Sequence, residues 1–307
     1  MTGRPTRVRA WVIAIRPATL PAAIGPVLVG LGVAWPEVGL RPLPAAGCLA
    51  VALLLQVAAN LANDLFDFRS GADAADRLGP PRAVAGGLLT EREVAIGIAV
   101  VLALAGLVGI GLVAIGGLVI LVLGVVAVLS AIAYTGGPWP YGYHGLGEVF
   151  VFVFFGLVAV GGTAYLQLGR WPPIAFATAV AMGALVTAIL VVNNLRDIEP
   201  DRRAGKRTLA VLLGPRATIA EYVGLLAVAY VVPVGLAAVG GVGPVVLLPL
   251  LSVPLVAQLV RTVRAVGEGG EGGDPRRLNP VLRGTARLSL VFAALLAVGL
   301  GLGGRAA

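Results

Sequence analysis

The sequence predicts an all-α membrane protein with nine transmembrane helices around a central cavity. Apolar residues make up 58% of the 307 residues and charged residues only 12%, whereas about 25% of residues are charged in soluble domains. The apolar residues form runs of about 20, the length that crosses a bilayer as a helix. We therefore predict a single integral-membrane domain over residues 1–307, with the lipid bilayer as its surroundings.

The predicted helices follow one another through short joints. The first apolar run contains Arg16 and Pro17 but continues to Trp35, which is too long for the apolar core of a secretory signal peptide. Glycines at 116–117 and 240–243 permit tight reversals between neighbouring helices. The nine predicted spans are 10–34, 43–68, 93–113, 116–134, 147–168, 174–194, 217–240, 243–263 and 286–303.

Basic residues predict the orientation of the chain in the membrane. If the N-terminus is cytoplasmic, 20 of the 23 basic residues lie on or near that side, and only Arg41, Arg170 and Arg305 lie on the other. Cytoplasmic loops of membrane proteins carry such an excess of Lys and Arg. We expect a multi-pass protein of the cell membrane with a cytoplasmic N-terminus. The net charge of +8 then needs no nucleic-acid partner.

Two polar motifs close long apolar helices. Asn60, Asp64 and Asp67 are spaced i, i+4 and i+7, which places them on one helix face. Asn193 and Asp197 repeat the pair Asn60 and Asp64, each 133 positions later. This repetition predicts two pseudo-repeated halves, roughly 1–134 and 135–307, whose acidic motifs face each other and open to the cytoplasm.

The aspartates of both motifs predict a metal and diphosphate site. Neighbouring carboxylates repel each other, and ionisable groups within a membrane are costly and usually functional. Magnesium binds through one or two carboxylates and completes its shell with water and phosphate oxygens. Since Pro200 disfavours helix at Glu199, we expect Asp201 just past the end of its helix. The predicted Mg²⁺ ligands and catalytic acids are Asp64, Asp67, Asp197 and Asp201, with Asp73 as a further metal ligand.

Two cations and one aromatic loop are predicted to complete the site. Arg82 and Lys206, the only lysine, each follow an acidic motif and suit diphosphate oxygens, although membrane anchoring also explains them. Residues 134–148 form a Pro/Gly-rich loop that carries Tyr134, Tyr141 and His144. An interfacial aromatic belt is one interpretation of this loop. We favour a loop at the cavity mouth, whose aromatic faces stabilise a developing cation.

These motifs resemble the UbiA superfamily of intramembrane prenyltransferases over nearly the whole chain. Asn63-Asp64-x-x-Asp67 matches the first family motif, but Gly71 stands where the last acid is expected and Asp73 follows two residues later. That departure is similar to the branch that prenylates 1,4-dihydroxy-2-naphthoate in menaquinone biosynthesis. The other segments that resemble this branch are 16–23, the Gly-Gly-Pro-x-Pro-Tyr loop, Leu146-Gly147-Glu148, 196–199 through 207–209, and Leu278-Asn279-Pro280.

The resemblance implies transfer of a polyprenyl group from a polyprenyl diphosphate to an aromatic small molecule, with Mg²⁺ as cofactor. For dihydroxynaphthoate, diphosphate and carbon dioxide would leave and a demethylmenaquinone would form. Asn60, Asn63 and Asn193 are implied substrate-binding residues, and Tyr134 an implied catalytic one. The alternatives are another acceptor, such as 4-hydroxybenzoate, and an ion-coupled transporter, whose acids would line a site near the membrane midplane.

Arg16 is the candidate cation for the carboxylate of the acceptor. An arginine inside a transmembrane helix is costly unless it faces a polar cavity. Pro17 and Pro21 are expected to bend this first helix and aim Arg16 inward. The alternative is that Arg16 extends to the cytoplasmic surface instead.

Overall fold

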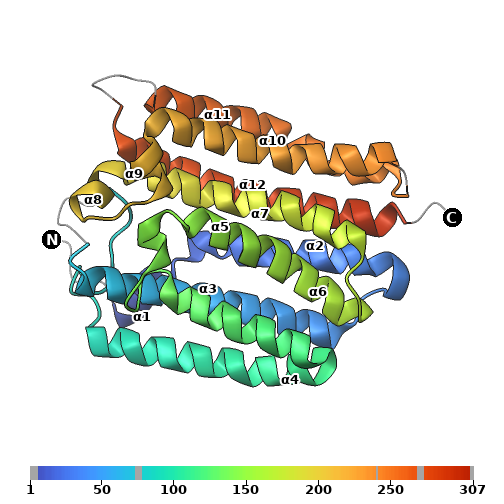
Figure 1. Ribbon diagram of the computed structural model, residues 1–307, viewed down its shortest axis with the longest axis horizontal. Coiled ribbons are helices and arrows are strands. Elements are labelled where there is room, and N and C mark those ends of the chain that lie inside the picture. Colours follow the sequence, from blue (N-terminus) through green and yellow to red (C-terminus); the bar gives the residue numbers. More distant parts are fainter. Residues whose placement is uncertain (1–5, 73–77, 240, 268–272, 305–307) are drawn as a thin grey trace.

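A computed structural model of the chain describes residues 6–72, 78–239, 241–267 and 273–304, and helices lying side by side account for most of them (Figure 1). The predicted all-α class is confirmed. Within the described ranges, eight helices are long and apolar enough to cross a membrane. The elements are α1 (Arg7–Ile15), η1 (Pro17–Thr19), α2 (Pro21–Val38), α3 (Pro42–Arg69), α4 (Glu91–Ala133), η2 (Tyr141–His144), α5 (Gly147–Val151), η3 (Phe152–Val158), α6 (Ala159–Leu168), α7 (Pro173–Arg196), α8 (Ile198–Arg203), α9 (Leu209–Leu213), α10 (Pro215–Val239), η4 (Pro244–Ser252), α11 (Val253–Gly267), η5 (Pro275–Arg277) and α12 (Leu278–Leu302).

The first predicted helix is broken rather than bent. Arg16 adopts a left-handed conformation with φ of 55°, and it separates α1 from η1 and α2. Pro17 explains the break, because its ring disfavours right-handed helix at the preceding residue. The prediction of one continuous helix over 10–34 was therefore wrong.

Helix α4 covers two of the predicted spans, 93–113 and 116–134. It begins with a capping box, in which the Thr90 side chain accepts from the Glu93 backbone and the Glu93 side chain accepts from the Thr90 backbone. Gly117 has φ of 65° and ψ of −153°, which only glycine adopts readily. The chain turns back at this point (Figure 1), at the predicted reversal.

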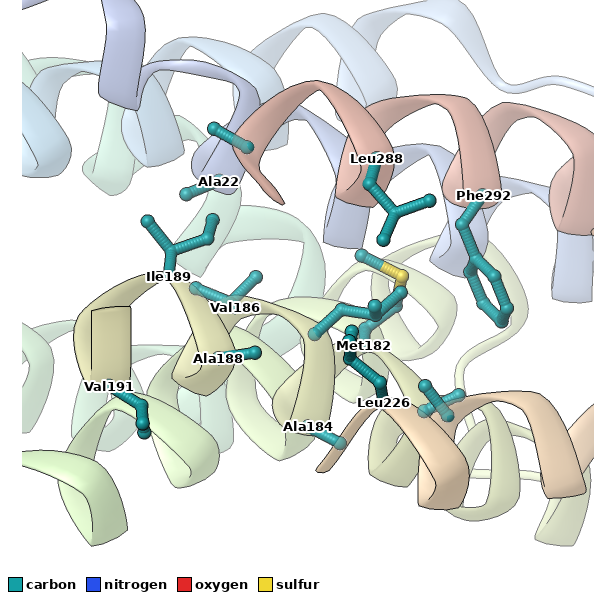
Figure 2. Packing of buried hydrophobic residues seen from close by; sticks show 14 of the residues in the cluster. Ala22, Met182, Ala184, Val186, Ala188, Ile189, Val191, Leu226, Leu288 and Phe292 are labelled. Atoms are coloured by element: carbon teal, nitrogen blue, oxygen red, sulfur yellow. The ribbon is translucent and has the colours of Figure 1, made fainter. Parts of the chain in front are cut away.

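Helix α7 is the most buried of the eight candidate spans in the described part of the chain. Its Met182 packs with Leu226 of α10 and with Leu288 and Phe292 of α12 (Figure 2). Helix α2 approaches α12 so closely that a Cβ at Gly32 would lie 2.6 Å from the Ala297 Cα. Small residues let membrane helices pack closely in this way, which keeps the bundle around the site in place.

The acidic motifs lie at one end of the bundle. In Figure 1 that end is on the left, with α1, α8 and α9, while the last turn of α12 lies on the right. An ion pair joins Arg170 to Glu37, two residues that the sequence places on the side opposite the acidic motifs. The orientation relative to the cytoplasm and the division into two similar halves stay predictions.

Candidate active site

A cavity of about 410 Å³ runs between the helices and receives side chains from both acidic motifs. Along α3 its lining extends from Cys48 to Asp67, about 28 Å at 1.5 Å per residue. One end of it is polar and the rest is apolar. The polar residues that line it include Arg16, Asn60, Asn63, Asp67, Arg82, Tyr134, Tyr141, Tyr143, Asn193, Asp197, Asp201 and Lys206.

The polar face of α3 first fixes the broken entry helix. The amide of Asn60 donates to the Ile15 carbonyl oxygen at 2.8 Å and to the Thr19 hydroxyl at 2.9 Å. These bonds hold the chain on both sides of Arg16, which lines the cavity. Asn60 thus positions the turn that carries Arg16.

Asp64 organises a loop and does not line the cavity. Its carboxylate is only 1% exposed and accepts the backbone N–H groups of Ala83 at 2.8 Å and Val84 at 3.2 Å. One residue earlier in the motif, the Asn63 side chain accepts from the Thr135 hydroxyl at 2.9 Å. The chain after the first motif is thereby folded back over it.

Asp67 is the centre of the charged network. One carboxylate oxygen accepts from Arg82 at 2.5 Å, and the other accepts from Lys206 at 2.9 Å and from the Tyr143 hydroxyl at 2.6 Å. The Lys206 ammonium also lies 4.5 Å from the centre of the Tyr143 ring. A buried carboxylate persists when it is paired in this way. The network joins the two motifs across the cavity.

The second motif brings two more carboxylates to the same cavity. Arg196 donates to both oxygens of Asp197, at 2.8 and 2.5 Å. Asp201 lies past the end of α7, as expected, but in a separate short helix, α8. Pro200 falls in the first turn of α8, where proline is tolerated. Burial raises the pKa of Asp201 to about 7, with Lys206 opposing the rise.

The aromatic loop contributes phenols but not the histidine. Tyr134 and Tyr141 line the cavity and meet edge to face, with ring centres 5.4 Å apart. Burial raises the pKa of both phenols above their usual value, so they stay protonated. The Tyr141 hydroxyl donates to the Ser130 carbonyl at 2.8 Å. His144 is exposed, stacks on Trp139 and does not line the cavity.

The carboxylates of the cavity suit Mg²⁺ in their chemistry. Asp67, Asp197 and Asp201 supply hard oxygen ligands, which Mg²⁺ prefers. Among the described residues, no three His, Cys, Asp or Glu side chains converge closely enough to hold one ion by themselves. A site that keeps open positions for water and phosphate oxygens fits that arrangement. Asp73, a further predicted ligand, lies outside the described residues.

The sequence analysis assigned no role to three residues in or beside the cavity. Tyr143 lies in the predicted aromatic loop but received no role there, while Arg196 and Asn279 were noted only as parts of longer segments. Arg196 is 2% exposed and donates to Asn279 at 2.9 Å. The available signal was its position beside Asp197, since a carboxylate at the end of a membrane-spanning helix is stabilised by a nearby cation.

The sequence matches the UbiA prenyltransferase family over residues 23–268. The chain belongs to this family. The family predicted from the sequence motifs is therefore confirmed, and with it the prediction of a prenyltransferase.

Relatives within the UbiA family cover almost the full chain. The 1,4-dihydroxy-2-naphthoate octaprenyltransferase of Mycobacterium tuberculosis is 44% identical over 294 residues, which span 95% of this chain and 97% of that protein. The enzyme of the same name from Haemophilus influenzae is 37% identical over 97% of both chains. A UbiA homolog from Archaeoglobus fulgidus, solved with GPP and Mg²⁺, matches with a TM-score of 0.62 at 17% identity, covering 95% of this chain and 99% of that one. This last likeness supports the fold.

Proposed function

We propose that this protein transfers a polyprenyl group from a polyprenyl diphosphate to 1,4-dihydroxy-2-naphthoate, releasing diphosphate and carbon dioxide and forming a demethylmenaquinone in its reduced, hydroquinone form. The observation that carries the proposal is the long cavity with two acidic motifs at one end, in a chain whose relatives are named for this activity. In this proposal the polar end of the cavity faces the cytoplasm.

The polar end provides the diphosphate site. Asp67, Asp197 and Asp201 would hold Mg²⁺ there. Bound Mg²⁺ supplies electrostatic stabilisation of the charge that develops on the departing diphosphate. Arg82 and Lys206 both reach Asp67 and would donate charge-assisted hydrogen bonds to phosphate oxygens.

The apolar part of the cavity suits the prenyl tail. Val51, Leu55 and Phe154 line its walls beyond the charged residues. A prenyl tail partitions from water into lipid at about 0.8 kcal/mol per CH₂ group, and the cavity continues such apolar surroundings along α3. The allylic carbon then lies beside the acids, where the faces of Tyr134 and Tyr141 stabilise the cationic carbon.

The reaction exchanges one bond for another on the allylic carbon. The C–O bond to diphosphate breaks with its electron pair on oxygen, and the electron-rich naphthoate ring forms a C–C bond to the allylic carbon. The bond between the ring and the carboxylate then breaks, so that carbon dioxide leaves and the electron pair of that bond returns to the ring. Arg16 lines the polar end and would pair with that carboxylate before the reaction.

The experiment is a prenylation assay of the purified protein with farnesyl diphosphate and either dihydroxynaphthoate or 4-hydroxybenzoate. We expect prenylated naphthoate only, and no product in excess chelator. Arg16→Ala should raise the KM of the naphthoate more than that of the diphosphate. Efficient prenylation of hydroxybenzoate without reaction of the naphthoate would overturn the acceptor and leave the diphosphate site standing.

A further inference from the structure

The start of α12 reaches into the acidic end of the bundle through one side chain. Asn279 donates from its amide nitrogen to the Leu78 carbonyl oxygen at 2.9 Å, and its amide oxygen accepts from Arg196 at 2.9 Å. Leu78 lies 201 residues away in sequence and Arg196 lies 83 residues away. Asn279 does not line the cavity. It therefore acts on the site only through these two partners.

The first partner, Arg196, is held by four hydrogen bonds in a buried position. Besides its two bonds to Asp197, it donates to the Asn193 side chain at 2.8 Å and to Asn279. Gly79 lies against its guanidinium, where a Cβ would be 2.9 Å from a terminal nitrogen. A guanidinium is rigid and planar. The hydrogen bond from its Nη1 to Asn279 therefore also fixes the orientation of the Nε and Nη2 atoms that donate to Asp197.

The second partner begins the segment that closes over the first motif. Leu78 lines the cavity, and the same segment supplies Arg82 to Asp67 and the backbone of Ala83 to Asp64. Residues 78–84 are thus tied to α12 at one end and to α3 at the other. Asn279 connects this segment to the second motif.

We propose that Asn279 is a positioning residue that fixes Asp197 and the segment 78–84 relative to each other for binding of the metal and the diphosphate. The proposal deepens the function proposed above and rests on it. Asparagine suits this role because it presents one acceptor and one donor on a single rigid amide. Aspartate has the same shape but only acceptors, so it retains the Arg196 contact and loses the Leu78 contact.

Three variants separate positioning from mere stabilisation. Asn279→Ala removes both contacts and Asn279→Asp removes one. Thr285→Val is the matched control, because Thr285 lies two turns along α12 and its hydroxyl is hydrogen-bonded to that of buried Tyr222 at 2.9 Å, away from the site. Each variant is purified as the full chain, and its unfolding midpoint is recorded. The Mg²⁺ concentration for half-maximal activity and the KM of each substrate are then measured. For each variant we would also measure hydrogen exchange of peptides covering 78–84 and the binding of farnesyl diphosphate in the presence of Mg²⁺.

We expect Asn279→Ala to raise the half-saturating Mg²⁺ concentration and the KM of the diphosphate about tenfold or more, as for a lost hydrogen bond to a charged group. The KM of the acceptor should change less than about twofold, since Arg16 is held elsewhere. Exchange over 78–84 should rise in both Asn279 variants, while Asn279→Asp keeps the Mg²⁺ response near that of the wild type. Thr285→Val should lower the unfolding midpoint without these changes.

Equal effects of Thr285→Val and Asn279→Ala on the Mg²⁺ response would overturn the proposal, as would unchanged exchange over 78–84 in both Asn279 variants. The proposed function fails differently. If the wild type does not prenylate the naphthoate, binding of farnesyl diphosphate with Mg²⁺ and hydrogen exchange still report whether Asn279 holds the site.

Discussion

The Asp201 carboxyl allows a direct test of how burial changes its pKa and, through it, the stability of the protein. Its side chain is 15% exposed, and its carboxyl lies 3.9 Å from the Lys206 ammonium. Burial is the main cause that raises its pKa from 3.8 to about 7, and the neighbouring Asp197 and Asp67 add to the rise. Between these two pH values the folded carboxyl keeps a proton that the unfolded one has released.

The sign of the pH dependence follows from this difference. Because the folded state binds more protons between pH 3.8 and about 7, the free energy of unfolding falls as the pH rises through that window. At about 1.4 kcal/mol per pH unit, the whole loss is at most about 4 kcal/mol above pH 7. Asparagine imitates the protonated acid and cannot titrate. Asp201→Asn should therefore be more stable than the wild type at pH 8, and the difference should shrink toward pH 5.

The assay is thermal unfolding of the detergent-purified protein in chelator between pH 5 and 8. Glu199→Gln is the control, since this acid of the same helix is 66% exposed and should leave the pH profile unchanged. Asp201→Asn should also lose turnover with Mg²⁺, because a charged ligand is gone. A variant less stable than the wild type at pH 8, or a stability difference independent of pH, would refute the reasoning.

Three further predictions test the charge network, the packing and the topology. Asp67→Asn should destabilise the protein by about 3–5 kcal/mol in unfolding assays, opposite in sign to Asp201→Asn, because it leaves two cations without their shared carboxylate; unchanged stability would count against the network. Gly32→Ala should lower the unfolding midpoint, because its Cβ would meet α12, whereas Gly106→Ala, with open space around it, should not. A cysteine at position 72, introduced in a Cys48→Ser background, should resist a membrane-impermeant reagent in intact cells, and one at position 39 should react; labelling at 72 would reverse the topology.

The helices and the grouping of the acids were predictable from sequence because both depend on local pattern. Runs of about 20 apolar residues locate spans, and i, i+4 spacing puts Asn60 and Asp64 on one face. The site residues Asp67, Asp197, Arg82 and Lys206 line one cavity. The spacing of the acids and the position of the two cations after them predicted these residues, but neither pattern predicted their hydrogen-bond partners.

The partners depend on contacts between distant segments, which a single sequence does not encode in any local pattern. Asp64 and Asp67 look alike in sequence, yet one binds backbone N–H groups and the other binds two cations. His144 attracts attention as the only histidine, but the turn at Pro140 directs it to solvent. Backbone strain was equally hidden, since the left-handed conformation of Arg16 follows from Pro17 and from the tertiary bonds of Asn60.

The pairing of each acidic motif with a nearby cation matters for how the chain enters the membrane. A buried carboxylate at the end of an inserting helix is costly while it has no partner. Asp67 meets Arg82 only 15 residues later, and Asp197 is gripped by the residue beside it. Lys206, the other cation bound to Asp67, lies 139 residues further along the chain. Chains are synthesised from the N-terminus, so Asp67 can pair with Arg82 before the second acidic motif exists. Insertion of the helix that carries either motif thus need not wait for the rest of the cavity to form.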